Sequence, residues 1–590
     1  MNVKAARKFA IYTFLILITA AVFWQVNQYD FIDLDDSVYV TDNNRLQSGL
    51  SPDGIIWSFS TFYAEFWHPL TWFSLFLDYG IYGLNAGGYH VTNVILHILS
   101  TLLLFRLFHR MTDDLWKSAF VAAAFALHPL HVESVAWIAK RKDVLSGFFW
   151  VLTLCFYVYY TKKTVVTRYL LVLFSFILAL MSKPMVVTLP AIMILFDFWP
   201  LNRMASRKGN PLLWQLKEKA PFFMLSAVFT VITFFAQHNP HAESFPLGFR
   251  IMRACTSFVT YLGKMFWPDC LAVYYPFSNQ LPVWPVIFST AFIIMISVGV
   301  IILFKRLPYL SVGWLWYAIT IFPIIGILNA PAKPISDHYT YLPSIGITIM
   351  LAWGVPSLFP AGNIRKKILF PASITFILVM AVLSWQQCSY WKNGWTLFSH
   401  ALQTTRDNAV AHSFLAVELD KEGKIEEALR HHNEAIRIIP DYFEAYTKRG
   451  NTYVKQGQYQ SAIQSYNEAV RLNPYYAASY NGRGTAYAEI GQYSKAIENY
   501  NQAITLRNDY PDAFYNRGLT YVKLHQYQLA FEDFNTCIRM KPNYRDAYHN
   551  RGVIYLSNGY VDPGCRDARK ACELGNCRLL EAAQGKQLCR

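Results

Sequence analysis

The sequence predicts an all-helical protein in two parts, a multi-pass membrane domain followed by an α-solenoid. Up to about Trp391 the chain consists of long apolar runs rich in Phe, Leu, Ile and Trp, separated by short basic clusters. From Asn408 onward it is polar, rich in Tyr and Asn, and evenly patterned. A chain of 590 residues is also too long for one hydrophobic core, so we expect at least two domains.

Eleven apolar runs in the first part are candidate membrane spans. Runs of about 18 residues with almost no charge match the apolar thickness of a bilayer. The runs cover roughly residues 9–26, 91–108, 118–137, 143–160, 169–181, 184–200, 220–236, 285–304, 311–329, 343–358 and 368–387. The interrupted aromatic pattern of residues 250–268 instead suits a helix that lies in the membrane interface.

The basic residues predict which ends of these spans face the cytoplasm. Lys4, Arg7 and Lys8 precede the first run, which we interpret as an uncleaved anchor with a cytoplasmic N-terminus. Alternation from there places every markedly basic loop but one inside, as the positive-inside rule requires. An odd number of spans leaves the chain after Gln386 outside. The net charge of +15 is therefore a topological signal, and nucleic-acid binding is not expected.

The C-terminal third predicts five tetratricopeptide repeats. Arg-Gly pairs end at Gly450, Gly484, Gly518 and Gly552, a constant spacing of 34 residues. This period, with small residues at the eighth and twentieth positions and an aromatic residue between them, is the signature of that repeat. The units are 409–442, 443–476, 477–510, 511–544 and 545–578. Their concave groove would bind a peptide, and the repeated Tyr and Asn residues are either a recognition surface or packing residues.

Four of the nine cysteines, Cys565, Cys572, Cys577 and Cys589, lie close to the C-terminus. Their spacing lacks paired C-x-x-C motifs, so two disulfides are favoured over a zinc site. On one helix, Cys565 and Cys572 would be about 10 Å apart, too far to be bridged. We therefore expect Cys572 to pair with Cys577 and Cys565 with Cys589. An oxidising compartment agrees with the predicted topology.

Paired carboxylates lie just beyond the first span, at Asp35 and Asp36. They suit general-base catalysis or a divalent metal that holds a phosphate, and the alternative is a solvated acidic loop. Downstream in the same loop, Ser51-Pro52-Asp53 precedes an aromatic stretch that predicts an interfacial helix. No cofactor is otherwise implied.

A second polar cluster is expected on the same face. Ionisable residues at membrane depth are costly, which makes them candidates for function. A carboxylate cluster opposite a cationic one suits transfer from a lipid-linked phosphate, because one deprotonates the attacking hydroxyl and the other neutralises the leaving phosphate. For Lys183 the alternative is snorkelling to the interface. The candidates are His128, His131, Glu133, Arg141, Lys142, Asp143, Lys183 and His338.

Five segments that occur in order resemble a known family. They are LDDSVYVTDN, WHPLTW with GYHVTNVILH, ALHPLHVESVAWIAKRKDVLS, KPMVVTLP followed by DFWPL, and HYTYLPSIG. With the repeats that follow, they are similar to the transmembrane and tetratricopeptide-repeat O-mannosyltransferases and their bacterial relatives, which have the GT-C glycosyltransferase fold. The resemblance implies inverting transfer of a sugar from a polyprenyl-phosphate donor to an acceptor at the outer membrane face.

The resemblance also implies roles for individual residues. The family's acidic pair matches Asp35 and Asp36, one of which would be the base. The HP-x-H-x-E motif matches His128, His131 and Glu133, and the basic turn matches Arg141 and Asp143. His338 stands where the family often has Arg. Pro184 stands where animal members tend to have Glu, which favours the bacterial branch and a bacterial inner membrane.

Two functional hypotheses follow from these observations. The first is a membrane glycosyltransferase whose repeats, in the periplasm, bind an acceptor or partner protein. The alternative is a non-catalytic scaffold whose membrane part only anchors the repeats. In either case we expect a membrane domain at 1–395 with an outer loop at 27–90, a linker at 396–408, repeats at 409–578 and a cysteine-containing cap at 579–590.

Overall fold

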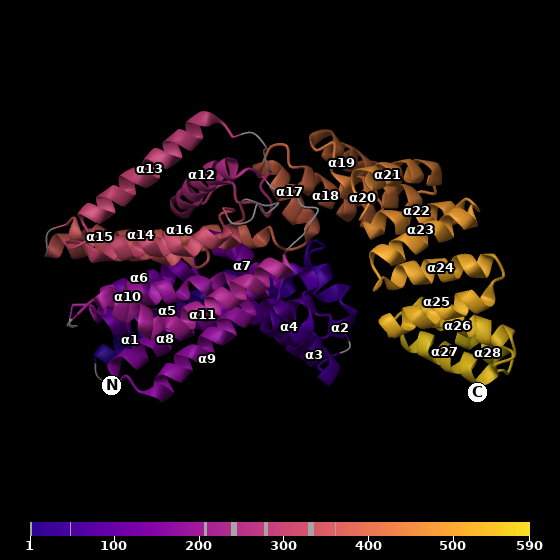
Figure 1. Cartoon of the computed structure of the whole chain (residues 1–590), viewed down its shortest axis with the longest axis horizontal. Coiled ribbons are helices and arrows are strands. Elements are labelled where there is room, and N and C mark those ends of the chain that lie inside the picture. The colour runs from indigo at the N-terminus through magenta and orange to yellow at the C-terminus, as the bar shows by residue number, and fades with distance from the viewer. Residues whose placement is uncertain are drawn as a thin grey trace. The chain divides into compact units, whose positions relative to one another are not determined.

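The computed structural model describes residues 3–47, 49–205, 209–237, 245–276, 281–327, 335–359 and 362–589. Within these ranges the regular elements are all helices, as predicted (Figure 1). The chain forms two compact units, Met1–Arg406 and Asp407–Arg590. The residues assigned to a linker, 396–408, lie mostly in a packed helix of the first unit, α17 (Gly394–Thr404), which buries Leu397, Phe398 and Ala401.

The first unit is a bundle of helices that follows the predicted apolar runs. Its longer helices are α1 (Val3–Phe23), α4 (Pro69–Tyr82), α5 (Ala86–Thr112), α6 (Leu115–Ala126), α8 (Arg141–Lys162), α9 (Val166–Ser182), α10 (Leu189–Phe198), α11 (Pro211–Ala236), α12 (Leu247–Phe266), α13 (Val283–Ile302), α14 (Pro308–Ile321), α15 (Pro343–Ser357) and α16 (Asn363–Ser389). Two short helices, α2 (Asn44–Gln47) and α3 (Pro52–Ser60), lie in the first loop, and α7 (Val132–Ala136) follows α6.

Among the described residues, six helices are long and apolar enough to cross a membrane, or seven if the bent pair 115–126 and 129–136 counts as one span. The other four predicted runs form shorter apolar helices, Val166–Ser182, Pro184–Phe198, Pro308–Ile324 and Pro343–Ser357. Two of these helices have a charged residue near one end, since Lys183 follows the first and Asp337 lies before the last. α12, where an interfacial helix was predicted, is not among these candidate spans.

Two glycines allow α14 and α15 to cross closely. A Cβ atom on Gly313 would lie 2.4 Å from the carbonyl oxygen of Gly346, and the reverse distance is the same. The crossing brings the first turn of α15 and the preceding turn, Asp337–Thr340, into the core of the bundle. Gly147 of α8 makes a similar approach, with its Cβ position 2.6 Å from the ring of Tyr341. These contacts fix the turn that carries His338 against the start of α8.

A buried ionic cluster closes the other end of α8. Arg203 donates to Tyr157, 2.7 Å away, and pairs with Glu218 at 2.8 Å. Lys219 pairs with Asp197 at 2.7 Å, and both side chains are almost completely buried. Arg203 and Lys219 contributed to the positive-inside signal, but in the structure their charges are neutralised by acidic neighbours. Tyr157 lies 16 residues, or about 24 Å of helix, from Arg141, so this cluster is remote from the candidate site.

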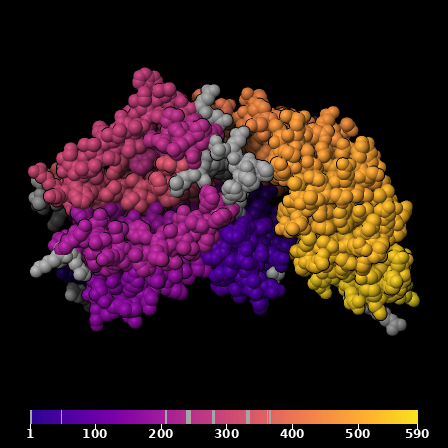
Figure 2. All heavy atoms as spheres, in the orientation of Figure 1, coloured from indigo at the N-terminus to yellow at the C-terminus, as the bar shows by residue number. Residues whose placement is uncertain are grey.

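The second unit consists of five helix pairs with the predicted repeat boundaries. The pairs are α18 (Ala409–Lys421) with α19 (Ile425–Ile438), α20 (Phe443–Lys455) with α21 (Tyr459–Leu472), α22 (Ala477–Glu489) with α23 (Tyr493–Leu506), α24 (Pro511–Lys523) with α25 (Tyr527–Met540), and α26 (Arg545–Ser557) with α27 (Val561–Glu573). Figure 2 shows them as a continuous band, coloured orange to yellow. α28 (Arg578–Gly585) follows the last pair.

Many of the repeated Tyr and Asn residues hold the repeats together. Tyr466 and Tyr500 are almost completely buried, and each ring packs against the eighth-position glycine of its repeat. In each of the last four repeats, one arginine donates to an asparagine of the preceding helix, at 2.5–2.9 Å. These pairs are Arg449–Asn433, Arg483–Asn467, Arg517–Asn501 and Arg551–Asn535. The same arginines donate to Ser465, Asn499, Asp533 and Asp567 on the following helix. For these residues the packing interpretation is therefore the better one.

The structure joins the four C-terminal cysteines in the expected pairs. Cys565 of α27 is bonded to Cys589, with Cα atoms 5.5 Å apart. Cys572 is bonded to Cys577, with Cα atoms 4.0 Å apart. The first bond joins α27 to the residues beyond α28, so it closes the end of the solenoid.

Replacing Gly484 with alanine should loosen its repeat. The new methyl group would lie 2.8 Å from the Tyr500 ring, which is itself buried, and such overpacking costs about 1–3 kcal/mol. We expect faster amide hydrogen exchange in α22 and α23 of the full-length Gly484→Ala protein. Gly585→Ala is the matched control, because nothing lies within 4 Å of its Cβ position. Equal exchange in the two variants would contradict the close packing described here.

Candidate active site

The residues singled out in the sequence gather at one end of the membrane helices. They come from the loop after α1, the turn between α6 and α8, the residue after α9 and the turn before α15. The backbone N–H of Asp30 donates to the carbonyl of Lys392, 3.1 Å away, so the first loop is tied to the end of α16. Segments far apart in sequence therefore share one polar region beside the apolar bundle.

The two carboxylates of the acidic pair have different environments. Asp36 is fully buried, and its two oxygens accept hydrogen bonds from the backbone N–H groups of Ile32, at 2.9 Å, and Ala139, at 2.8 Å. Burial raises the pKa of Asp36 to about 7, although these two bonds act in the opposite direction. Asp36 thus anchors the first loop to the turn before α8.

Asp35 instead faces the solvent-accessible part of the site. Its side chain is 36% exposed, and its carboxylate lies 3.6 Å from the ammonium of Lys140. That ammonium also lies 4.1 Å from the centre of the Trp137 ring. Because Asp36 is occupied by backbone donors, Asp35 is the member of the pair that an incoming hydroxyl can reach.

Three lysines on this side of the bundle are buried, a rare state for this residue type. Besides Lys140, they are Lys142, which donates to the Tyr39 hydroxyl at 2.7 Å, and Lys183, which forms an ion pair with Asp143. Lys183 is only 6% exposed, so it does not snorkel to the interface. The three ammonium groups make this a cationic site in a region of low dielectric constant, where each charge acts strongly.

Tyr339 connects the carboxylates to this cationic group. Its ring centre lies 5.7 Å from the ammonium of Lys183. Burial raises the pKa of its hydroxyl, and the charges of Asp143, Glu133 and Asp35 raise it further. The charges of three carboxylates therefore act on a side chain of the turn before α15 that also lies near Lys183.

Several buried groups in this region lack hydrogen-bond partners among the described residues, and two of them lie close to the lysines. One is Oδ2 of Asp143, and the other is His68, both of whose ring nitrogens are unpartnered. Burial lowers the pKa of His68 well below its usual value, and the charges of Lys142 and Lys183 add to the effect. The neutral ring packs against the aromatic rings of Tyr39 and Trp72, which also contact each other. A bound ligand or water would satisfy such atoms.

Sequence reasoning assigned no role to His68. The residue lies in the WHPLTW segment, which contributed only to the resemblance. A usable signal was present, because the His-Pro pair at 68–69 repeats the one at 128–129, and in both places the proline opens a helix. Its position beside Lys142 depends on how the first loop folds, which no local pattern reveals.

Arg141 is not available to a substrate in this structure. Its guanidinium is fully buried and donates to Asn93 at 2.5 Å, Ser74 at 2.9 Å, Asp78 at 2.6 Å and the carbonyl of Tyr89 at 2.9 Å. These partners belong to α4 and α5. Arg141 therefore fixes the first turn of α8, from which its neighbours Lys142 and Asp143 reach the site.

The histidines of the HP-x-H-x-E motif are also engaged by the protein. Nε2 of His128 donates to the carbonyl of Met265 at 2.9 Å, and Nδ1 of His131 donates to that of Phe125 at 2.7 Å. The other nitrogens accept from the backbone N–H of Leu130 and the hydroxyl of Ser344. Both rings thus position the turn rather than face a ligand.

Glu133 and His338 form a pair that joins this turn to the one before α15. The carboxylate of Glu133 lies 2.7 Å from Nδ1 of His338 and accepts the backbone N–H of the same residue at 3.0 Å. His338 stands at the position where the similar family often has an arginine. In this chain the residue forms a buried pair with Glu133. The other predicted residues are engaged by the protein itself. The best candidates for binding or catalysis are therefore Asp35, Lys142, Asp143 and Lys183.

The donor set does not fit a divalent metal. Such ions take several oxygen ligands, but both oxygens of Asp36 accept backbone hydrogen bonds and Asp35 is paired with Lys140. Within the described ranges, no three His, Cys, Asp or Glu side chains come together as a metal site. We therefore derive no step that uses a metal at the acidic pair.

Comparison with known proteins gives relatives that match about two thirds of the chain. A protein O-mannosyl-transferase of Caenorhabditis elegans is 25% identical over 440 residues, which cover 70% of this chain and 60% of that protein. Human TMTC1, also called a protein O-mannosyl-transferase, is 23% identical and covers 65% and 49%. The chain resembles the transmembrane and tetratricopeptide-repeat O-mannosyltransferases. It spans about half to three-fifths of the length of these curated relatives.

The repeats match separately. Family models described as TPR repeat and tetratricopeptide repeat match residues 419–457, 450–491, 484–525 and 511–544. A crystal structure of MamA is 28% identical and covers 29% of this chain and 97% of its own, with a TM-score of 0.25. The crystal structure of YrrB, a TPR protein with an unusual peptide-binding site, is 21% identical and covers 32% of this chain and 97% of its own, with a TM-score of 0.26.

Replacing Arg141 with methionine should destabilise the membrane unit. The change leaves Asp78 buried without its cation, and breaking a buried ion pair costs about 3–5 kcal/mol. We expect a lower melting temperature in detergent and less protein in the membrane. The double variant Arg141→Met with Asp78→Asn should recover part of the loss, because no buried charge is then unpaired. A single variant as stable as the native protein would contradict this role.

Proposed function

We propose that this chain is a membrane glycosyltransferase that moves a sugar from a polyprenyl-phosphate donor to a hydroxyl group of an acceptor protein. The main support is the placement of the half-exposed Asp35 beside three buried lysines at one end of the membrane helices. The names of the relatives, protein O-mannosyl-transferases, support the reaction class. The lipid-phosphate donor is supported by the buried cations, which suit an anionic group that approaches from the bilayer.

In the proposed reaction, Asp35 acts as the general base. It accepts the proton of the acceptor hydroxyl as the hydroxyl oxygen attacks the anomeric carbon of the sugar. The bond from that carbon to the phosphate oxygen breaks, its electron pair leaves with the phosphate, and the configuration at the carbon inverts. Lys140 holds Asp35 in place, and Asp36 fixes the loop that carries it.

The leaving phosphate would bind on the side of Lys142 and Lys183. Negative charge develops on its oxygens during bond cleavage, and preorganised cations in a site shielded from water stabilise it without rearrangement. The neutral His68 has one ring N–H to donate and no partner for it among the described residues. These three residues come from α8, the residue after α9 and the start of α4.

The same proposal assigns roles and places to the two units. The residues 1–395 would form the catalytic membrane domain, with the site on the outer face, and the repeats at 409–578 would bind the acceptor or a partner protein. The two disulfides of the C-terminal end support an oxidising compartment, as the periplasm is. The basic loops support a cytoplasmic N-terminus, and we propose a bacterial inner membrane as the location.

Replacing Asp35 with asparagine should abolish transfer without affecting the fold. Loss of a general base lowers the rate by about 10²- to 10⁴-fold. We expect a fall of at least about 100-fold in the transfer of radiolabelled sugar from a polyprenyl phosphate in isolated membranes, with an unchanged melting temperature. The control is Asp30→Asn, which changes an exposed carboxylate of the same loop and should keep its activity.

Activity in Asp35→Asn within about tenfold of the native protein would overturn the base assignment. If instead neither the native chain nor any variant transferred sugar from any lipid phosphate, the membrane domain would be an anchor for the repeats.

Replacing Lys142 with glutamine should weaken donor binding in particular. The change removes one buried cation but keeps a group that can donate to Tyr39. We expect KM for the lipid donor to rise about tenfold or more, with a smaller change in KM for the acceptor, and partial recovery in Lys142→Arg. Lys162→Gln, at the opposite end of α8, is the control. A change confined to the acceptor's KM would place the phosphate elsewhere.

A further inference from the structure

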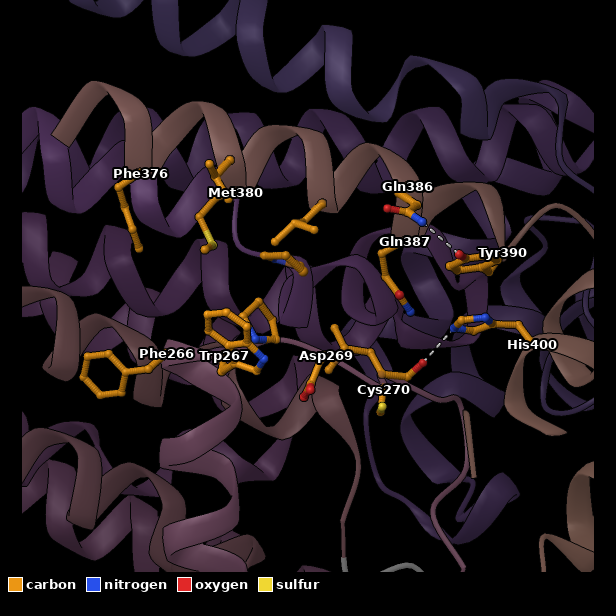
Figure 3. Close-up of a pocket in the computed structure, with 15 residues that line it drawn as sticks. Phe266, Trp267, Asp269, Cys270, Phe376, Met380, Gln386, Gln387, Tyr390 and His400 are labelled. Carbon is orange, nitrogen blue, oxygen red and sulfur yellow. Dashed lines mark hydrogen bonds between the residues drawn. The ribbon is translucent and has the colours of Figure 1, made fainter. Parts of the chain in front are cut away.

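A cavity of about 620 Å³ opens in the membrane unit outside the site described above. It lies between α16, the segment that follows α12, and the start of α17 (Figure 3). None of the proposed catalytic or phosphate-binding residues lines it. Its volume falls within the range of about 300–1,000 Å³ that is typical of ligand sites.

One wall of the cavity is a stripe of side chains along one face of α16, apolar at one end and polar at the other. Phe376, Met380 and Leu383 lie at the spacing that places side chains on one face of a helix, and they belong to the apolar span 367–389. The stripe ends in Gln387 and Tyr390, at and just beyond the end of that span. Figure 3 shows Phe376, Met380 and Gln387 directed from α16 toward the facing segment. The wall thus changes from apolar to hydrogen-bonding within one helix.

The opposite wall is held by two histidine hydrogen bonds. It consists of residues 266–271 and includes Trp267 and Asp269. Just before it, Nε2 of His128 donates to the carbonyl of Met265, and at its end Nε2 of His400 donates to that of Leu271, 3.1 Å away. The His400 ring also stacks on Tyr390, with ring centres 3.5 Å apart. The segment 266–271 that bounds the cavity is therefore held by a hydrogen bond at each end.

The polar end of the cavity does not suit a negative charge. Of the described residues that line it, none is Lys or Arg, and Asp269 contributes a carboxylate. Burial lowers the pKa of His400, which favours its neutral form. The ammonium of nearby Lys264 is engaged by the carbonyls of Asp269 and Cys270. A phosphate there would lie beside the carboxylate of Asp269, and none of the described lining residues is a Lys or Arg that could balance it, whereas hydroxyl groups can bond to the amide of Gln387.

We propose that this cavity binds a lipid with a single aliphatic chain along the α16 stripe and an uncharged, hydroxyl-bearing head at Gln387 and Tyr390. This site is separate from the one proposed for the lipid phosphate. The phosphate site is lined by lysines, whereas the described lining of this cavity includes a carboxylate and no Lys or Arg. It does not depend on the chain being a glycosyltransferase. The two sources of such a lipid are a glycerolipid with one acyl chain and a free polyprenol.

The test is photolabelling of the full-length protein in detergent with three diazirine probes. They are a monoacylglycerol, a polyprenol, and the phosphate ester of the same monoacylglycerol. We expect an uncharged probe to label peptides of residues 376–390 or 266–271, and the phosphate ester to label them at least about fivefold less. The stronger of the two uncharged probes identifies the source.

Two variants of neighbouring residues test the position. Leu383→Trp fills the cavity and should lower labelling by at least about fivefold, whereas Val382→Trp, on an exposed face of α16, should not. If Leu383→Trp does not fold, Gln387→Glu places a charge at the polar end and should lower labelling in the same way. Equal labelling by the phosphate ester, or labelling that neither Leu383→Trp nor Gln387→Glu reduces, would overturn the proposal.

Discussion

The site depends on the burial of a single guanidinium. Arg141 has no contact with solvent, and its hydrogen bonds reach α4 and α5, so three helices meet at one side chain. The residues on either side of it in sequence, Lys140 and Lys142, extend from that point toward Asp35 and Tyr39. A buried arginine needs every one of its donors satisfied, because an unpaired charge in a low dielectric is costly. That requirement determines where the first turn of α8 lies.

The candidate site collects charge without a large imbalance. Lys140 and Lys183 are paired with the carboxylates of Asp35 and Asp143, and Lys142 is bonded to the neutral hydroxyl of Tyr39. Such an arrangement keeps the cost of burying lysines low in the resting protein. An incoming phosphate would then compete with carboxylates for the same ammonium groups, so its binding would be favoured where a lysine has a weak internal partner. Lys142, bonded to a neutral tyrosine, is in that position.

Periodic features of the sequence predicted the structure well. The 34-residue period gave the boundaries of the five helix pairs, because close helix packing needs glycine at fixed positions such as Gly484. The cysteine spacing predicted two disulfides, and helix geometry excluded a bond between Cys565 and Cys572 on α27, whereas the choice between the two remaining pairings was a hypothesis that agrees with the structure. The apolar runs located the membrane helices, although polar residues shorten several of them. Each of these signals is local, so it can be interpreted without knowing the tertiary structure.

Roles that depend on distant contacts were not accessible in this way. A charged residue such as Arg141 looks the same in sequence whether it binds a phosphate or fixes a helix, and only the positions of Asp78 and Asn93 separate the two. The members of the pair Asp35–Asp36 likewise differ because the backbone N–H of Ala139, about 100 residues away, donates to Asp36 and leaves Asp35 as the proposed base. His68 went unassigned for the same reason.

The arginine ladder of the repeats makes their number adjustable. Arg517 donates to Asn501 before it and to Asp533 after it, each 16 residues away, and Arg483 stands in the same relation to Asn467 and Asn499. Removal of one whole unit would bring Arg517 opposite Asn467, so no guanidinium would lose its acceptor. Gain or loss of a unit therefore changes the length of the array in a single step while the arginine ladder stays intact. Selection can in this way fit the reach of the solenoid to its ligand without redesigning any interface.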